Sequence, residues 1–269
     1  MLSRRPGFRF NRGRIHVPVG ASAAWYPGDD FLVVMDPDRG VTLSGDDVTD
    51  VANQGTGGAT YDFTQATEAA RFEFQAADAN WNDQPSLLSD GNDWLVSAAP
   101  LANLRFLHDG TGHDVVMLIR SPGSATLRAI VATKFSFGAI GFVACLSAVG
   151  TNKPHYQVHN GTANIATDTH ANAISVDTKT ALRWSYVDAA SPEWLHSINA
   201  ANEETGSDTG VPSASDATAL TIGALSTGGS PLVSGDSIAL VVIHNARFTA
   251  QQWSDLKGYI NTRFDMSLP

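Results

Sequence analysis

Short apolar stretches, separated by clusters of Gly, Asp, Asn, Ser and Thr, follow one another from about residue 31 to residue 245. This spacing is typical of the strands of a β-sandwich or barrel and does not fit alternating β and α units. In one stretch Leu182, Trp184 and Tyr186 occupy every second position, which predicts a strand with one buried face. Arg183 and Ser185 would lie on its other, exposed face. Examples of the predicted strands are residues 31–35, 115–119, 127–132, 140–146, 181–187, 194–198 and 238–244.

A single segment near the C-terminus has a helical period. Its apolar residues recur at every third or fourth position, at Trp253, Leu256, Ile260 and Phe264. Thr249, followed three residues later by Gln252, matches a capping box, in which the two side chains satisfy free backbone N–H groups of the first turn. These patterns predict a helix over about residues 249–263 that packs its apolar stripe against the sandwich.

Two segments fall outside the pattern of strands. Residues 202–219 are rich in Glu, Asp, Ser, Thr and Gly, and they predict a long exposed loop. Residues 1–30 contain several Pro and Gly residues ahead of the first predicted strand, and they predict an extended arm. We therefore expect a basic N-terminal arm over residues 1–30 and one sandwich domain over residues 31–269.

The composition is consistent with one large buried core. Of the 269 residues, 43% are hydrophobic and only 16% are charged, which is far from the composition of a disordered chain. The one cysteine, Cys145, lies inside a predicted strand, so an internal disulfide is excluded. No signal-peptide-like apolar segment follows the first residues and no run of 18 apolar residues occurs, so we expect neither a secretion signal nor a membrane span.

The formal net charge of −10 is unevenly distributed along the chain. Five arginines precede residue 20, namely Arg4, Arg5, Arg9, Arg12 and Arg14, and they leave 12 basic against 27 acidic residues in the rest of the chain. Because the chain after residue 20 is so acidic, we expect it to repel nucleic acid and anionic membranes. The arm can instead dock on an acidic neighbouring subunit through bidentate Arg–carboxylate contacts, or fold back on its own acidic body. We expect residues 1–20 to bind other proteins of an assembly and the chain to form a homo-oligomer.

Motifs at both ends of the body, in a fixed order, resemble those of a known family. They comprise residues 36–43, residues 48–54, the hairpin Leu88-Ser89-Asp90-Gly91-Asn92-Asp93-Trp94-Leu95, and then residues 220–224, 235–238, 241–245 and the C-terminal helix. Together they resemble the LamG-like family of concanavalin A-like lectin and glucanase folds, which is common among bacteriophage structural proteins. One segment departs from the family pattern, because residues 50–54 lack its Trp-Ala-Asp-Gln motif. The resemblance implies an all-β, two-sheet jelly-roll sandwich with one C-terminal helix.

No catalytic constellation is recognisable in the sequence. A glucanase of this fold needs two carboxylates, a nucleophile and an acid/base, about 5 Å apart on one strand face. The five glutamates, Glu68, Glu73, Glu193, Glu203 and Glu204, do not form the Glu-x-Asp-x-Glu pattern of glucanases of this fold. Glu203 and Glu204 are adjacent, would point to opposite faces of a strand, and lie in the predicted loop. A G-x-S-x-G nucleophile motif is also absent. We therefore expect a protein that is not an enzyme.

An acidic turn flanked by two tryptophans is the candidate ligand site. Trp81 and Trp94 can stack on a sugar ring while Asp90, Asn92 and Asp93 bind its hydroxyls, although Trp94 in the family hairpin normally belongs to the core. The same turn offers oxygen ligands for calcium. Two other sets of carboxylates do so as well: Asp36 with Asp38, and Asp46 with Asp47 and Asp50. Asp and Asn are also ordinary turn residues, so we expect no cofactor, with calcium as the one candidate.

Two pairs of histidines were weighed as metal ligands. His155 and His159 are four residues apart in an alternating run and share one strand face, but no third ligand follows from their spacing. His108 and His113 bracket a Gly-rich turn. We interpret both pairs as surface histidines at strand ends.

Three functions remain open. The first is a phage virion subunit, assembled in the host cytoplasm, whose arm docks on a capsid, tail or fibre while its jelly roll stabilises the shell or adheres to glycans. The second is a freestanding carbohydrate-binding lectin, in which the arm plays no part. The third is an atypical glycoside hydrolase, which would lose turnover when Glu193 or Glu203 is replaced by Gln.

Overall fold

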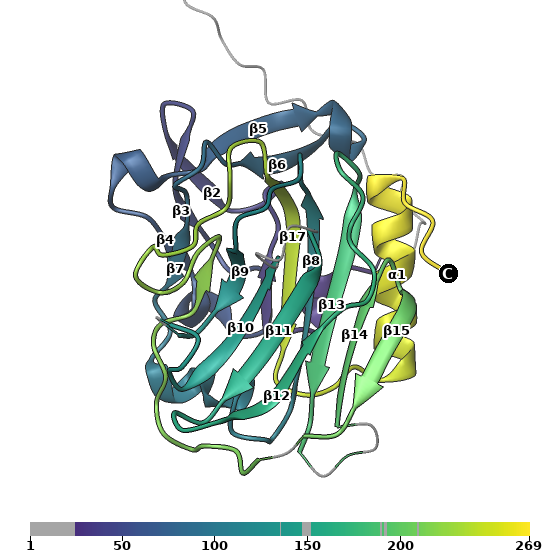
Figure 1. Ribbon diagram of the computed structural model, residues 1–269. Helices are drawn as coiled ribbons and strands as arrows, with labels where there is room; N and C mark the ends of the chain where they lie inside the picture. Colours follow the sequence, from purple (N-terminus) through teal and green to yellow (C-terminus); the bar gives the residue numbers. More distant parts are fainter. Residues whose placement is uncertain (1–24, 135, 147–151, 189, 191–192, 209) are drawn as a thin grey trace, which may run out of the picture.

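The computed structural model describes residues 25–269 except residues 135, 147–151, 189, 191–192 and 209. Antiparallel strands form two layers, and a helix lies beside one of them (Figure 1). The first layer runs in the order β2 (Val41–Ser44), β3 (Asp47–Val51), β4 (Phe63–Thr64), β7 (Leu95–Ser97), β16 (Thr221–Ile222), β9 (Arg128–Ala132), β10 (Gly141–Leu146), β11 (Pro154–His159) and β12 (Asn164–Thr169).

The second layer is built around the longest strands. Its order is β5 (Glu73–Asp78), β6 (Gln84–Leu88), β17 (Ser237–His244), β8 (His113–Arg120), β13 (Thr180–Tyr186), β14 (Trp194–Ile198) and β15 (Ala201–Gly206), and β1 (Val33–Met35) also pairs with β17. A pairing of Asp47 with Glu73 links the layers. Short 3-10 helices lie in the connections, at Pro27–Asp29, Gly58–Tyr61, Glu68–Ala70, Ala79–Trp81 and Leu101–Leu107. The predicted all-β sandwich is confirmed.

The C-terminal helix α1 (Ala250–Phe264) is also confirmed. Thr249 is its N-cap, and the capping box with Gln252 is complete: the Gln252 N–H donates to Thr249 Oγ1 at 3.2 Å and the Thr249 N–H donates to Gln252 Oε1 at 3.0 Å. Leu256, Ile260 and Phe264 are fully buried against the second layer. The local capping pattern and the apolar stripe were therefore sufficient to place this helix.

The central strands β8, β13 and β17 of the second layer are buried on both faces, because the main core covers one and α1 covers the other. The expectation that Arg183 and Ser185 face solvent is therefore wrong, as both are buried. Arg183 forms a bidentate ion pair with the buried Asp114, at 2.9 and 2.6 Å, and its guanidinium lies 4.6 Å from the centre of the Trp253 ring. Alternation along the strand could not predict the helix that covers its polar face.

The predicted loop over residues 202–219 begins as a strand. β15 pairs with β14 across a two-residue turn, Asn199–Ala200, in which both residues have positive φ angles of 54° and 55°. Such a turn is typical of a hairpin, but Ala is unusual in the second position. Glu203 is exposed and Glu204 is half-buried, as expected for neighbours on opposite faces of a strand.

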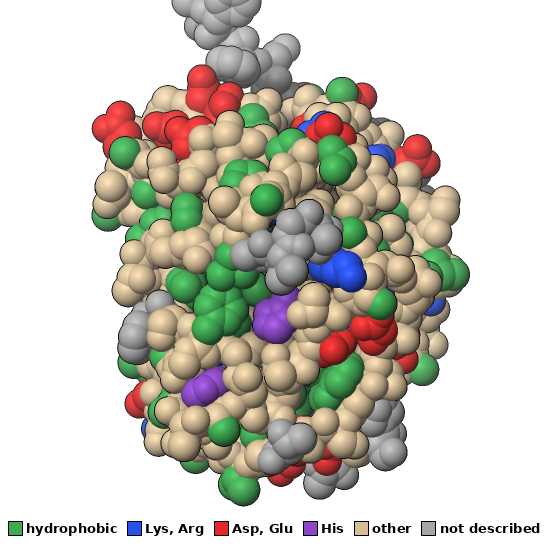
Figure 2. Space-filling view, in the orientation of Figure 1, with side chains coloured by type: hydrophobic (Ala, Val, Ile, Leu, Met, Phe, Trp, Pro, Cys, Tyr) green, Lys and Arg blue, Asp and Glu red, His purple; other side chains and the backbone are tan. Residues whose placement is uncertain are grey.

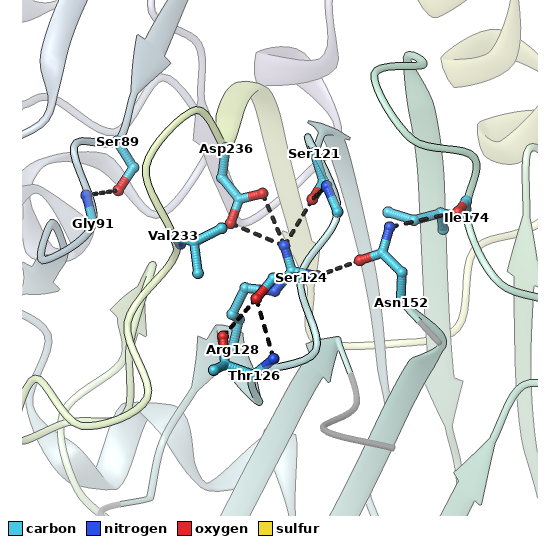
Figure 3. A network of polar contacts seen from close by, with 11 residues as sticks. Ser89, Gly91, Ser121, Ser124, Thr126, Arg128, Asn152, Ile174, Val233 and Asp236 are labelled. Atoms are coloured by element: carbon cyan, nitrogen blue, oxygen red, sulfur yellow. Dashed lines mark hydrogen bonds and ion pairs between the residues drawn. The ribbon is translucent and has the colours of Figure 1, made fainter. Parts of the chain in front are cut away.

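A buried ion pair lies where β9 approaches the start of β17. Arg128 and Asp236 are both fully buried, and Arg128 Nη1 lies 3.0 Å from Asp236 Oδ1 (Figure 3). The same guanidinium donates to Ser121 Oγ at 2.7 Å and to Asn152 Oδ1. Asp236 Oδ2 accepts a bond from the Val233 N–H at 2.9 Å. The pair thus ties together connections that are distant in the sequence.

Candidate functional site

The predicted sugar site does not assemble as expected. Trp81 is fully buried under α1, where its Nε1 donates to Ser237 Oγ at 2.9 Å, so it cannot stack on a ligand. Asp93 is also buried and accepts a bond from the Asp90 N–H at 2.6 Å, and burial raises the pKa of Asp93 to about 6. Trp94 is half-buried, whereas Asp90 and Asn92 are exposed. The turn therefore keeps exposed polar groups but lacks the stacking residue Trp81.

The carboxylates considered for calcium are partly engaged by protein groups. Asp36 is buried and pairs with Arg263 at 2.5 and 3.0 Å, and Asp38 lies 3.3 Å from the same guanidinium. Among the described residues, two groups of three His, Asp or Glu side chains converge closely enough to hold an ion. They are His170, His196 and Glu204, and Asp188, Glu193 and Asp208. Neither group includes a carboxylate that the sequence suggested for calcium.

The expectation that His108 and His113 lie on the surface is wrong. Both are fully buried: His113 starts a central strand that is covered on both faces, and His108 lies in the connection before it, where its Nε2 is 2.8 Å from the Ser215 carbonyl oxygen. His113 packs 4.8 Å from Phe142, between ring centres, and burial lowers its pKa to about 3. The expectation is also wrong for His159, which is buried and accepts a bond from the Gly161 N–H at 2.9 Å. His155 is half-buried and bonds Thr169 Oγ1 at 2.8 Å.

A groove of about 420 Å³ lies between the start of the described chain and the outer side of α1. We call it the α1 groove. It is lined by Trp25, Tyr26, Arg39, Ser254, Asp255, Gly258, Tyr259, Thr262 and Arg263. Ligand sites typically combine a concave, largely apolar surface with a few well-placed polar groups, and this lining has both.

Three aromatic rings form one side of the α1 groove. The Tyr259 ring packs edge-to-face against Trp25 at 6.3 Å and against Tyr26 at 5.9 Å, measured between ring centres. The two tyrosine hydroxyls converge on the buried Asp36 carboxylate, with Tyr259 Oη at 3.2 Å from Oδ2 and Tyr26 Oη at 3.5 Å. Burial raises the pKa of both tyrosines, so they remain neutral donors. Arg263, which pairs with Asp36, fixes this arrangement.

Residues with small side chains on α1 form a second side of the α1 groove. Ser254, Gly258 and Thr262 are spaced by four residues, so they lie above one another on the same face of α1, and all three are exposed. A side chain at Gly258 would meet no atom within 4 Å of its Cβ. The exposed Arg39 guanidinium stacks 4.1 Å above the Tyr26 ring at the same groove. Flat apolar rings, small hydroxyls and a cation thus face one open space.

Sequence reasoning missed this site for two reasons. Trp25 and Tyr26 fall inside the segment interpreted as an arm, and Tyr259 was noted only as part of the C-terminal helix in the family resemblance, not as a binding residue. One signal was available, since a glycine inside a helix costs stability relative to alanine and often has a packing or functional reason. The arginines Arg4, Arg5, Arg9, Arg12 and Arg14 lie outside the described residues.

No family model matches the chain, and no curated protein matches it. Among solved structures, a sialidase of Trypanosoma rangeli in complex with sialic acid is similar, with a TM-score of 0.53 and 13% identity over 91% of this chain and 35% of the sialidase. The receptor-binding domain of a botulinum neurotoxin C/D mosaic serotype is also similar, with a TM-score of 0.58 and 6% identity over 85% of this chain and 51% of that one. The chain thus spans about a third and about half of these two proteins.

These similarities confirm the β-sandwich fold and leave the LamG-like resemblance without a matching family model. They contradict the prediction that the protein is not an enzyme, because the similar structures include sialidases, which are glycoside hydrolases. At such low identity the likeness shows the fold alone, and fold does not determine function. Within the described residues, no helix is both long and apolar enough to cross a membrane.

Proposed function

We propose that the protein binds carbohydrate in the α1 groove. The observation that carries this proposal is the convergence of Trp25, Tyr26 and Tyr259 on an open groove of about 420 Å³. The fold supports it, since the similar solved structures include a sialidase with bound sialic acid and the receptor-binding domain of a toxin. This is the lectin hypothesis of the sequence, moved to a different site.

The chemistry of the groove matches that of a sugar. A pyranose ring has an apolar C–H face that packs on aromatic rings and a rim of hydroxyls that need hydrogen-bond partners. The exposed hydroxyls of Ser254 and Thr262 and the half-buried carboxylate of Asp255 offer such partners along α1. The open position at Gly258 lets a ring approach the helix backbone.

Substitutions at Gly258 provide the test. We expect Gly258→Trp to fill the α1 groove and to weaken glycan binding at least tenfold, because the space above this position is empty. Gly258→Ala is the matched control. It should leave binding unchanged and raise the free energy of unfolding by about 0.5–1 kcal/mol, because alanine is the better helix former. Glycan-array screening of the full chain identifies the ligand, and calorimetric titration with that glycan gives the Kd of each variant.

An unchanged Kd in Gly258→Trp, with the variant still folded, would contradict the proposal. Loss of binding in Trp94→Ala with retention in Gly258→Trp would instead place the ligand at the acidic turn predicted from the sequence. The glycan is also assayed for cleavage products after incubation with the protein, which tests directly for glycoside hydrolysis. The virion hypothesis stays a prediction, because its docking residues lie outside the described part of the chain.

A further inference from the structure

Four polar side chains, none of which lines the α1 groove, meet at the seam between the two layers. Strand β12 is the edge of the first layer, and β14 and β15 form the edge of the second. We call the set Asp168, His170, His196 and Glu204 the seam cluster. Figure 2 shows acidic side chains exposed to the right of the centre of this face, over the region where β12 passes in front of β14 and β15 in Figure 1.

In the seam cluster, the ligand atoms of His170, His196 and Glu204 lie within 4.8 Å of one another, and Asp168 contacts His196. His196 Nε2 is 2.8 Å from Asp168 Oδ2 and 3.1 Å from Glu204 Oε2. His170 Nδ1 is 3.6 Å from Glu204 Oε1. Both histidine side chains are buried, at 0% and 1% exposure, whereas the carboxylates are 29% and 28% exposed. The two histidines are therefore held in the interior, whereas the two carboxylates are accessible to solvent.

These separations are close to those that a zinc ion imposes. Bonds of about 2.0–2.2 Å in a tetrahedral site place neighbouring ligand atoms roughly 3.3–3.6 Å apart. The distances of 2.8 and 3.1 Å at His196 therefore need to open by only a few tenths of an ångström. Two carboxylates also share one imidazole N–H here, and a cation would neutralise the resulting excess of negative charge.

Neighbouring groups orient the ligands. His170 Nε2 lies 2.7 Å from the Asn202 carbonyl oxygen, to which it must donate, so its Nδ1 is left as an acceptor, and this Nδ1 accepts a bond from the Asn172 N–H at 3.0 Å. Glu204 Oε1 accepts a bond from the Ala171 N–H at 2.8 Å. Backbone contacts of this kind commonly hold the ligands of metal sites. His170 is therefore held in place beside the other ligands. Its Nδ1 can bind an ion only if its hydrogen bond with the Asn172 N–H breaks.

His196 can release its Nε2 proton without losing another hydrogen bond. In the described part of the structure its Nδ1 has no partner, so the imidazole proton is free to move to Nδ1 when Nε2 binds an ion. The hydroxyl of the buried Tyr156, whose ring centre lies 5.6 Å from that of His196, is also without a partner there.

We propose that Asp168, His196 and Glu204 bind a divalent transition-metal ion of the Zn²⁺ class, with one coordination position open to solvent. His170 is the nearest further nitrogen donor. Such an ion joins β12 to β14 and β15, and so it crosslinks the edges of the two layers. The inference is independent of carbohydrate binding, because it uses no residue of the α1 groove.

The test uses the full chain after removal of metal with a chelator. Titration with ZnCl₂ is expected to show one equivalent bound with a Kd in the micromolar range or below, and Zn²⁺ at about a hundred times its Kd should raise Tm by about 5–10 °C. Asp168→Asn and Glu204→Gln should each weaken binding at least tenfold. Glu203→Gln is the matched control, since it removes the neighbouring exposed carboxylate of β15, and its Kd should equal that of the unmodified protein.

Absence of binding at about 100 μM ZnCl₂ would overturn the inference. An unchanged Kd in both Asp168→Asn and Glu204→Gln, which we call the seam variants, would also overturn it. So would selective loss of binding in Glu193→Gln, which would move the ion to Asp188, Glu193 and Asp208. Circular dichroism of the metal-free variants shows whether they are folded. Co²⁺ substitution provides a second readout, because the visible absorption of Co²⁺ in the unmodified protein should indicate protein ligands and should be lost in the seam variants.

Discussion

Replacing His113 with phenylalanine should make the protein resistant to acid, with a gain of about 3 kcal/mol at pH 4 relative to pH 7.5. His113 is fully buried between Phe142 and Tyr186, with ring centres 4.8 and 6.0 Å away. Burial lowers its pKa from the ordinary 6.5 to about 3. Between these two values the unfolded chain binds a proton that the folded chain does not, so stability is lost as the pH falls from 6.5 to 3.

Urea denaturation of the unmodified protein and of His113→Phe at both pH values tests this result. The comparison at pH 7.5, where the imidazole is neutral in both states, isolates the packing difference between the two rings. The acid effect is then the change in free energy of unfolding between pH 7.5 and pH 4. An equal change in both proteins would show that His113 does not cause acid sensitivity.

The second large effect is expected at the buried pair of Arg128 and Asp236. We expect Asp236→Asn to lower the free energy of unfolding by about 3–5 kcal/mol, because it leaves the Arg128 guanidinium without a counter-charge at 0% exposure. The substitution also places an amide where Arg128 and the Val233 N–H both need an acceptor. Thermal and urea denaturation give the size of the loss.

An ion pair near the surface provides the control. Arg120 and Asp177 are also in contact, at 2.7 Å, but their side chains are 20% and 53% exposed. Asp177→Asn should cost about 0–1 kcal/mol, since solvent screens this pair, and asparagine tolerates the positive φ of 55° at this position. The double variant Arg128→Met/Asp236→Asn should lose less stability than the sum of its two single variants. If Asp236→Asn and Asp177→Asn lost equal free energy of unfolding, this would contradict the expectation that Asp236→Asn leaves a buried charge uncompensated.

Local patterns were sufficient for the long central strands and for the C-terminal helix. The predicted strand over residues 194–198 coincides with β14, and the predicted helix differs from α1 by one residue at each end. Strand β15 was missed because its residues are polar and its position depends on pairing with β14. An edge strand held by backbone hydrogen bonds needs no apolar alternation, so its sequence resembles that of a loop.

The candidate sites were harder to predict, because burial and convergence are properties of the folded chain. Trp81 has the side chain of a sugar-binding residue, but α1 packs over it. The α1 groove brings Trp25 and Tyr26 from one end of the chain to Gly258 and Tyr259 at the other. No spacing rule connects residues so far apart.

The seam cluster illustrates the same division. Glu204 was noted only as a neighbour of Glu203 in a predicted loop, yet pairing places it 3.1 Å from His196. By itself, the sequence determined the class of fold, the C-terminal helix and the acidic body, because short-range periodicity, capping and charge are written in adjacent residues. Only the tertiary structure decided which tryptophan is buried, which carboxylates meet a histidine and where a groove opens, because these depend on contacts between strands and a helix that are distant along the chain.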